Sequence, residues 1–537
     1  MTNQKPKANR SDQNTRLSGS EFRRGVLRMG GNYIRLFITV CIGLMLVRVI
    51  LAGWGNDAWA LIALLGGTLG IAAMLQDIVR QSMIRELGSA LHSGDEDHFL
   101  STYNSSLVIT ACVGVITFIT VLIIAVILPV FKIPDELLEV ARWLVIAKGV
   151  ETVFAVLVGA PMNMYIATER MALSNLWIVV QRLCPIATAV WIILIQGIED
   201  PVQGLKTYAV VSSSLFIAVT TIAVLVIVAL DRRLIPRLRL VSRKAIRELL
   251  HIGGWNAVAV TSLGLHIRID AILMNLFFGL GGNLIYGFTS QLTSYVRMLA
   301  MGVSYGLDAV TTRITSKEGE AVLQDLCFHI TRLNSCIAMP AAAGLFIMAE
   351  PILTIWVGDR MENPTTELPL TVTLIRVMSL GMVIRALTDG WIKILYGAGH
   401  VAKYAPLILG AVIANPILAI ILYFVLPEPI RFTFAVTAYS SVYVIANLVL
   451  LPRLMGKLLG GGAFSILAPM VRPLIVTIIS MSGLSFAVSY FDQWSLLLLF
   501  GVSAGYGVVY VLLVSLIVLR ADERQRVFTL LRKGTNR

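Results

Sequence analysis

The chain has 537 residues, of which 57% are apolar and only 14% are charged. A water-soluble protein of this length needs far more charge to cover its surface, so the composition excludes a soluble globular protein and is typical of a polytopic membrane protein. The net charge of +13 would otherwise suggest nucleic acid as a partner, but no nucleic-acid module interrupts the apolar segments of the chain.

The first 25 residues are polar and basic and contain no apolar core. We do not expect them to form a cleavable signal peptide, and the first apolar segment, which starts near Asn32, is expected to act as the start-transfer helix. We expect residues 1–29 to form a basic tail on the cytoplasmic side.

Apolar segments long enough to cross a membrane follow one another along the whole chain. Each spanning helix needs about 20 mainly apolar residues, and fourteen segments meet this requirement. They cover residues 32–52, 58–77, 102–130, 137–160, 172–196, 207–230, 249–278, 283–310, 326–350, 369–396, 404–426, 432–451, 465–489 and 494–519. The sequence therefore predicts an all-α polytopic membrane protein with about fourteen transmembrane helices.

The basic residues of the connecting segments are distributed unequally between the two sides of the membrane. One side holds 28 lysine and arginine residues, including both termini, and the other side holds only 4. Because basic loops stay in the cytoplasm, we expect both termini to be cytoplasmic. The same loops are expected to contact anionic membrane lipids, which explains the positive net charge without nucleic acid.

Two stretches of similar sequence indicate an internal repeat. "LRMGGNYIRLF" at 27–37 is echoed by "LHIGGWNAVAV" at 250–260, and both begin a helix that runs from the cytoplasm to the periplasm. The repeat predicts two lobes of six helices in the same orientation, related by an axis along the membrane normal. We place the lobes at 30–230 and 249–451, followed by helices thirteen and fourteen at 465–519 and a basic cytoplasmic tail at 520–537.

The two lobes are joined by a basic linker at 231–248. Leu238, Val241, Ala245 and Leu249 recur at helical spacing, with arginine and lysine side chains on the opposite face. This pattern predicts an amphipathic helix at the cytoplasmic membrane surface that connects the two lobes.

Twelve lysine and arginine residues lie inside the predicted spans, against about half as many acidic residues. Arg268, Arg297 and Arg385 lie about ten or more residues from either end of their spans, and Lys148 and Arg182 are nearly as deep. Such residues are too deep to reach the membrane surface easily, so they must face protein or a water-filled cavity. The excess of basic groups predicts a cavity that binds an anion.

The candidate site residues follow from these positions. Candidate substrate-binding residues are Arg268, Arg297, Arg385, Lys148, Arg182 and Arg332. Candidate ion-coupling or counter-ion residues are Asp270, Asp389 and His266. Helical spacing places Arg385, Asp389 and Lys393 on one face, where they are expected to pair, and it places His266 on the same face as Asp270.

Two roles remain open for Asp270. It could be the permanent counter-ion of a neighbouring cavity arginine, or it could titrate and couple a proton to transport. The excess of basic groups favours the counter-ion role.

No cofactor, metal or disulfide is expected. The five cysteines all fall inside apolar segments, and none forms a Cys-x-x-Cys pair. We interpret them as small residues at helix contacts.

Five stretches of the chain have a recognisable pattern. They are "DAWALIALLGGTLGIAAMLQD" (57–77), "RELGSALHSGDEDHF" (85–99), "IRIDAILMNLFFGLGGNLIYGFTSQL" (267–292), "AEPILTIWVGD" (349–359) and "ILYGAGHVAKY" (394–404). With the two halves and fourteen spans, they resemble the multidrug/oligosaccharidyl-lipid/polysaccharide exporter superfamily, and within it the O-antigen-type flippases of polysaccharide biosynthesis. In this resemblance Asp270 matches the acidic residue of the seventh helix, and "ILTIWVGD" matches a Leu-Trp-Gly motif after the ninth.

The resemblance implies a V-shaped pair of six-helix lobes around a central cavity and transport by alternating access. The implied substrate is an undecaprenyl-diphosphate-linked oligosaccharide, moved from the cytoplasmic to the periplasmic leaflet of the bacterial inner membrane. Arginine suits a diphosphate because its guanidinium binds phosphate oxygens through two hydrogen bonds. We further expect a monomer that works beside a polysaccharide polymerase machinery.

Three other functions are alternatives to the flippase. A cation-coupled drug or metabolite antiporter and a lipid II flippase belong to the same superfamily, and the former would be expected to have an acidic interior. A membrane glycosyltransferase, polymerase or ligase would need an acidic base or a large external loop, whereas the longest external connection, at 357–368, contains no histidine. No phosphate-binding loop, zinc spacing or nucleophile motif occurs, so an enzyme is not expected. The coupling ion and the identity of the sugar remain open.

Overall fold

The computed structural model describes residues 19–302 and 320–519, together with isolated positions between these ranges and position 524. The described residues form helices and turns, and no β-strand occurs among them. The predicted fold class, an all-α polytopic membrane protein, is confirmed.

The first half of the chain forms six α-helices. They are α1 (Gly19–His92), α2 (Glu96–Ile127), α3 (Asp135–Leu157), α4 (Gly159–Ala167), α5 (Met171–Val190), which continues as a π-helix over Trp191–Ile195, and α6 (Pro201–Leu230). Two starts are capped by aspartate, since Asp95 accepts the N–H of His98 at 3.0 Å and Asp200 accepts that of Gln203 at 2.9 Å.

The second half continues with helices of different lengths, four of which, α12 to α15, are short. They are α7 (Arg243–Met301), α9 (Glu320–Trp356), α10 (Pro364–Gly397), α11 (Val401–Val425), α12 (Glu428–Arg431), α13 (Phe434–Val444), α14 (Leu451–Leu459), α15 (Gly462–Leu467), α16 (Val471–Ser489) and α17 (Leu496–Leu513). A π-helix over Ile445–Leu450 joins α13 to α14, and another follows α17 at Val514–Val518.

The two longest helices, α1 and α7, are each broken at one glycine. Gly55 has a φ of 81° and Gly279 a φ of 67°, a left-handed conformation that costs glycine little. Each break lies between two of the spans that the sequence predicts, at 52–58 and at 278–283. The two halves of the chain therefore begin with the same kind of element, a long helix that reverses direction at a glycine.

Eleven described helices are long and apolar enough to cross a membrane, or up to twelve if α3 and α4, which meet at a bend of 52°, form one broken span. The segments Gly30–Asp77 and Ala257–Met301 are each counted once in this number, although each is broken at a glycine between two predicted spans. The exact number of fourteen spans stays a prediction.

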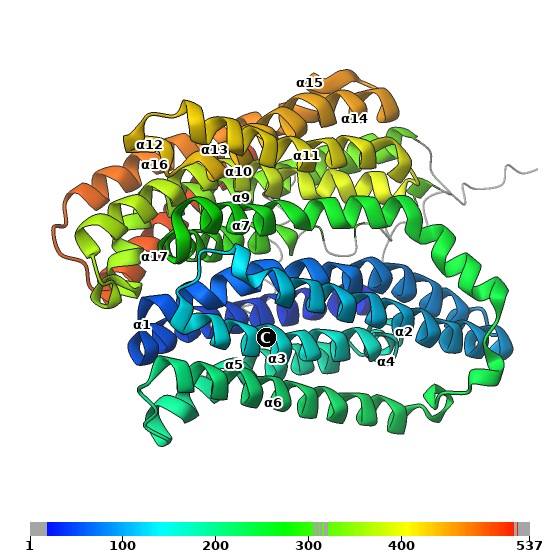
Figure 1. The fold of residues 1–537 in the computed structure, drawn as a ribbon. Helices are drawn as coiled ribbons and strands as arrows, with labels where there is room; N and C mark the ends of the chain where they lie inside the picture. Colours follow the sequence, from blue (N-terminus) through cyan, green and yellow to red (C-terminus); the bar gives the residue numbers. More distant parts are fainter. Residues whose placement is uncertain are drawn as a thin grey trace, which may run out of the picture.

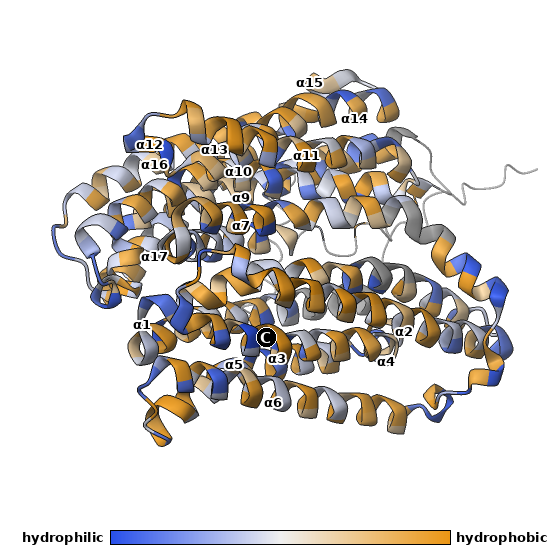
Figure 2. Ribbon diagram, in the orientation of Figure 1, coloured by the Kyte–Doolittle hydropathy of each residue, from blue (hydrophilic) through white to orange (hydrophobic). Residues whose placement is uncertain are grey.

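The helices of the two halves form two groups (Figure 1). The groups meet mainly through α1 and α7, and they diverge toward the end of the molecule where the linker after α6 crosses from one group to the other (Figure 1). The largest apolar core includes residues of both groups, among them Leu64 of α1, Phe288 of α7 and Trp356 of α9. Figure 2 shows hydrophobic residues along most of the helices, whereas hydrophilic residues gather at the turns and in the linker.

Polar contacts join the two groups at the end that carries the glycine breaks. The Arg48 guanidinium donates to the carbonyl oxygens of Ile355 and Trp356, at 2.9 and 2.8 Å, and to the carboxylate of Asp359 at 2.9 Å. In return, the Trp356 indole donates to the Leu44 carbonyl at 2.9 Å. Arg48 thus satisfies carbonyl groups at the end of α9 that have no partner within the helix. These contacts hold one end of the molecule closed.

The linker differs from the single amphipathic helix that the sequence predicts. It contains two short 3-10 turns, Arg232–Leu234 and Leu238–Leu240, and the α-helix begins only at Arg243. Ala245 and Leu249 are buried, whereas Leu238 is 72% exposed, so the apolar residues of the pattern do not form one common face. The pattern failed because hydrogen bonds to α2 hold the backbone of the linker in turns, which periodicity cannot show.

Candidate functional site

His266, Arg268 and Asp270, the polar residues of the predicted seventh span, lie on α7. His266 and Asp270 are buried, and Arg268 is half-buried. Asp270 is fully buried, and its Oδ1 accepts a hydrogen bond from the Asn415 amide of α11 at 2.7 Å. In the part of the chain that the structure describes, neither Oδ2 of Asp270 nor Oδ1 of Asn415 has a hydrogen-bond partner. Two buried oxygen atoms without a donor are costly, so this pair is a candidate site for a bound cation.

His266 and Arg385 lie beside the same tyrosines of α13. The His266 ring packs against Tyr443 at 4.8 Å and Tyr439 at 6.1 Å between ring centroids. Arg385 of α10 donates to the Tyr443 hydroxyl at 2.8 Å and to the carbonyl of Leu263, and its guanidinium lies over the Tyr443 ring at 5.4 Å. Only 2% of Arg385 is exposed, so in this conformation it contacts protein groups and offers no surface to a ligand.

Arg297 and Asp389 form an ion pair between α7 and α10. The distances are 2.7 Å from Nε to Oδ2 and 3.3 Å from Nη2 to Oδ1. The Arg297 side chain remains 24% exposed, and that of Asp389 is 11% exposed. Asp389 therefore has an ion-pair partner on another helix, whose guanidinium offers two aligned donors, and it also lies within electrostatic range of Arg385 on its own helix.

Arg268 does not lie with these residues. Its side chain extends from α7 to α1 of the first half. Its guanidinium lies directly over Gly70, because a Cβ atom built there would be 1.5 Å from Nη1 and 2.6 Å from Cζ. Asp77, two turns further along α1, is near enough to interact electrostatically with Arg268. Arg268 is thus a contact between the two halves of the molecule.

A methyl group at position 70 tests this placement. We expect Gly70→Ala to displace the flexible Arg268 side chain without unfolding the protein, and so to reduce transport as much as Arg268→Ala does. The double variant should transport no worse than Arg268→Ala alone, because both changes act on the same contact. Transport of the wild type and of the three variants is measured at matched protein abundance.

Gly66→Ala is the matched control, since nothing lies within 4 Å of a Cβ atom at that position, one turn earlier on α1. It should transport normally, and its stability should be unchanged or higher by up to about 1 kcal/mol because alanine favours a helix. Additive losses in the double variant would contradict the placement of Arg268.

Two of the remaining candidates, Lys148 and Arg182, lie in the first half, and the third, Arg332, lies in the second. Lys148 pairs with Glu151 at 2.7 Å, both side chains being about one-fifth exposed, and its ammonium lies 5.7 Å from the centre of the Tyr208 ring. Arg182 of α5 is exposed and near enough to interact electrostatically with Tyr295 of α7. Arg332 of α9 belongs to the second half, and its guanidinium lies 6.0 Å from the Phe328 ring centre.

The structure therefore brings together only some of the candidates. Asp270, His266, Arg385, Asp389 and Arg297 lie around the tyrosines of α13, and Tyr439 is within electrostatic range of Asp270, Arg385 and Arg297. Lys148, Arg182, Arg268 and Arg332 lie elsewhere. We call the first group, with its neighbours Asn415, Tyr439 and Tyr443, the second-half polar cluster.

Sequence reasoning missed Asn415, Tyr439 and Tyr443. An asparagine in the middle of an apolar helix and two tyrosines one turn apart are signals that could have found them. Among the described residues, no group of three or more histidine, cysteine, aspartate or glutamate side chains could hold a metal ion. The arrangement offers the partly exposed guanidinium of Arg297 to an anion and the buried carboxylate of Asp270 to a small cation.

Comparison with known proteins gives one family and one curated relative. Residues 67–363 match the family model described as "Polysaccharide biosynthesis protein". The chain is 24% identical over 311 residues to the "Uncharacterized membrane protein EpsK" of Bacillus subtilis (strain 168), a match that covers 56% of this chain and 59% of that protein. The chain thus matches less than two thirds of the length of this relative.

Solved structures share the fold at low sequence identity. A multidrug resistance MATE family transporter of the MOP superfamily in an inward-facing conformation has a TM-score of 0.65 at 15% identity, over 80% of this chain and 100% of that chain. The lipid II flippase MurJ, in an inward closed conformation, has a TM-score of 0.61 at 14% identity, over 90% and 98%. A MOP superfamily transporter from Pyrococcus furiosus, described by a reverse polarity of its binding pocket, has a TM-score of 0.58 at 15% identity, over 80% and 96%.

Proposed function

The chain belongs to the polysaccharide biosynthesis protein family of the multidrug/oligosaccharidyl-lipid/polysaccharide exporter superfamily, and on that premise we propose that it flips an undecaprenyl-diphosphate-linked oligosaccharide across the membrane. It is a multi-pass membrane transporter of the polysaccharide-biosynthesis type. The proposed direction is from the cytoplasmic to the periplasmic leaflet of the bacterial inner membrane, with both termini in the cytoplasm. No chemical reaction is proposed for it.

The observation that carries the proposal is an accessible arginine in each half of the molecule. Arg182 of the first half is exposed and within electrostatic range of Tyr295 of α7. Arg297, on another face of α7, remains 24% exposed. A diphosphate carries charges that a guanidinium binds through two parallel hydrogen bonds. These two side chains are the proposed contacts of the substrate diphosphate, one from each half.

The second-half polar cluster supports the proposal of ion-coupled transport. The buried carboxylate of Asp270 has an amide as its partner, and no arginine or lysine contacts it within the described residues. The counter-ion role that the sequence favours for Asp270 therefore lacks a partner, and we propose instead that Asp270 and Asn415 bind the coupling cation, a proton or a sodium ion.

Two related functions are distinguished by the charge of the interior. A drug antiporter that binds organic cations needs acidic groups exposed to its cavity, whereas the carboxylates of Asp270 and Asp389 are buried or paired. A lipid II flippase would also carry a lipid diphosphate, so the sugar part of the substrate separates it from the proposed function.

Depletion of the protein in its own cells tests the proposal. Lipid-linked oligosaccharide should accumulate on the cytoplasmic side, and surface polysaccharide should fall, while peptidoglycan synthesis continues. Mass spectrometry of the extracted undecaprenyl lipids identifies what accumulates. Accumulation of lipid II, or unchanged lipid-linked oligosaccharide with increased sensitivity to cationic drugs, would contradict the proposal.

A further inference from the structure

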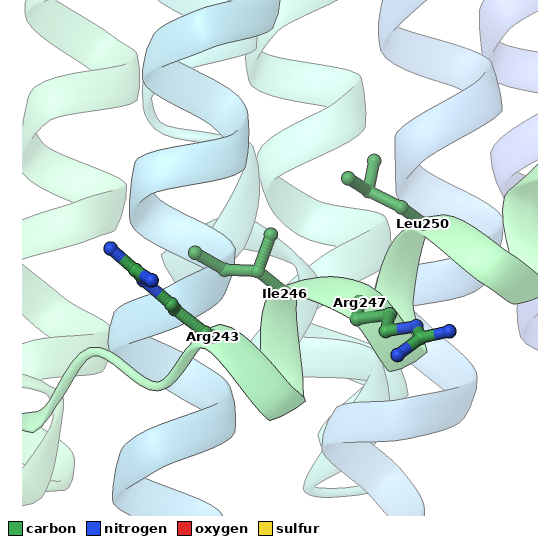
Figure 3. Close-up of a pocket in the computed structure, with 4 residues that line it drawn as sticks. All are labelled: Arg243, Ile246, Arg247 and Leu250. Carbon is green, nitrogen blue, oxygen red and sulfur yellow. The ribbon is translucent and has the colours of Figure 1, made fainter.

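The first turns of α7 carry a surface pocket that the proposed function does not use. Its volume is about 460 Å³, and it is lined by Arg243, Ile246, Arg247 and Leu250. Figure 3 shows Ile246 and Leu250 pointing the same way from the helix, with Arg243 and Arg247 on either side of Ile246. The pocket therefore combines two cationic side chains with two apolar ones.

Hydrogen bonds from α2 fix the segment that leads to this pocket. Tyr103 donates to the Leu234 carbonyl at 3.0 Å, and Asn104 accepts the N–H of Arg237 at 2.6 Å. Ser105 accepts the N–H of Ser242 at 3.1 Å and donates to its carbonyl at 3.4 Å. Three consecutive buried side chains of α2 thus hold the linker up to the residue where α7 begins.

The opposite face of the first turns of α7 is packed against the first half. Ala245 and Leu249 are 5% and 4% exposed, and Leu249 belongs to the apolar core formed by α1, α2, α4 and α6. Because this face is buried, the arginines and Leu250 are directed outward. Leu250 is 59% exposed, and Arg243 and Arg247 are both exposed. Neither arginine forms an ion pair with an acidic residue of the described chain.

Exposed apolar residues also lie on both sides of the pocket along the chain. Along the linker, Ile235 is 47% and Leu238 is 72% exposed, and both alternate with exposed arginines. Beyond the pocket, Trp255 is 51% exposed on the same helix. Exposed apolar residues interleaved with arginine, followed by an exposed tryptophan, are typical of a segment that lies at the level of the lipid headgroups.

We propose that this pocket binds an anionic phospholipid, with the phosphate between Arg243 and Arg247 and the start of an acyl chain against Ile246 and Leu250. A free phosphate would use the two arginines but would leave the exposed leucine in water. A phospholipid uses both parts of the pocket. The lipid would bind where α7 leaves the first half and enters the second, at the end where the two groups of helices diverge (Figure 1).

Native mass spectrometry of the purified full chain, titrated with phosphatidylglycerol or with phosphatidylcholine of the same chain length, tests the proposal. The wild type should bind one phosphatidylglycerol more tightly than phosphatidylcholine. Arg243→Gln/Arg247→Gln should bind it about thirty-fold more weakly, since each basic residue near an anionic headgroup contributes roughly five-fold. Leu250→Gln should also weaken phosphatidylglycerol binding, and inorganic phosphate should not displace the lipid.

Arg232→Gln/Arg239→Gln is the matched control, because it removes the same charge from exposed linker residues outside the pocket. It should bind phosphatidylglycerol as the wild type does. Equal weakening in both double variants would show a diffuse basic surface and overturn the proposal. So would displacement of the lipid by inorganic phosphate together with unchanged binding in Leu250→Gln, which would show a phosphate site alone.

Discussion

Arg297→Ala should lower the rate of lipid-linked oligosaccharide transport by about 100-fold, which corresponds to roughly 2.7 kcal/mol and is typical of the loss of one partner of a partly buried charge pair. Two effects contribute. The substrate diphosphate loses a guanidinium that is 24% exposed in the free protein, and Asp389 loses its partner. Arg297→Lys should recover only part of the rate, because an ammonium cannot form the two parallel hydrogen bonds. The rate is measured in proteoliposomes with equal amounts of inserted protein.

The double variant Arg297→Ala/Asp389→Ala separates the two effects. If Arg297 binds substrate, removing both partners still leaves transport impaired. If Arg297 serves only to neutralise Asp389, the double variant recovers transport, and Arg297 no longer belongs to the substrate site. Arg472→Ala is the control, since Arg472 is exposed near the start of α16 and should be dispensable.

Asp270→Asn should abolish transport driven by an ion gradient and leave the protein folded. Asparagine has the shape of aspartate and can keep the hydrogen bond to Asn415, so helix packing between α7 and α11 is preserved. It cannot, however, carry the charge that a buried cation would neutralise. Exchange of substrate without a gradient should continue. The measurement compares gradient-driven transport with exchange in the same proteoliposomes, under a proton gradient and under a sodium gradient.

Glu350→Gln is the matched control for Asp270→Asn, because Glu350 is an exposed carboxylate in α9 of the same half. It should not change coupling. A variant Asp270→Asn that loses exchange as well as gradient-driven transport, at normal stability, would indicate that Asp270 positions other groups of the second-half polar cluster. Unchanged gradient-driven transport would remove Asp270 from the coupling site.

The fold class could be predicted from the sequence because hydropathy determines where a spanning helix forms, and glycine where a helix can reverse, without contacts from distant residues. A run of apolar residues specifies a spanning helix wherever it occurs, and Gly55 and Gly279 lie in the short gaps between predicted spans. The individual polar residues were also found, since any charge in an apolar run is conspicuous.

The partners of these charges could not be predicted from spacing. Helical periodicity places Asp389 beside Arg385 and Lys393, but it gives no sign of the ion pair with Arg297, which is 92 residues away in the sequence. Asp270 likewise contacts Asn415, which is 145 residues away. Periodicity within one helix does not determine which other helix faces it, and a carboxylate takes the donor with the best geometry.

The structure of the linker likewise could not be predicted from helical spacing alone. Four apolar residues at helical spacing predict one helix, but Tyr103, Asn104 and Ser105 of α2 bind the linker backbone in turns. Side chains that hydrogen-bond to a backbone can override its helical pattern. Only contacts between distant segments reveal this outcome.

We propose above all that this chain moves a lipid-linked, anionic sugar across a membrane. The most direct measurement reconstitutes the purified protein in liposomes containing a fluorescent undecaprenyl-diphosphate oligosaccharide and follows the fraction that a membrane-impermeant quencher can reach. The wild type should move the lipid between leaflets, and Arg297→Ala should do so about 100-fold more slowly. The uncharged undecaprenol-linked analogue should not be moved. Movement of the uncharged analogue at the same rate, or no movement of the diphosphate lipid by a protein that transports a cationic drug, would contradict it.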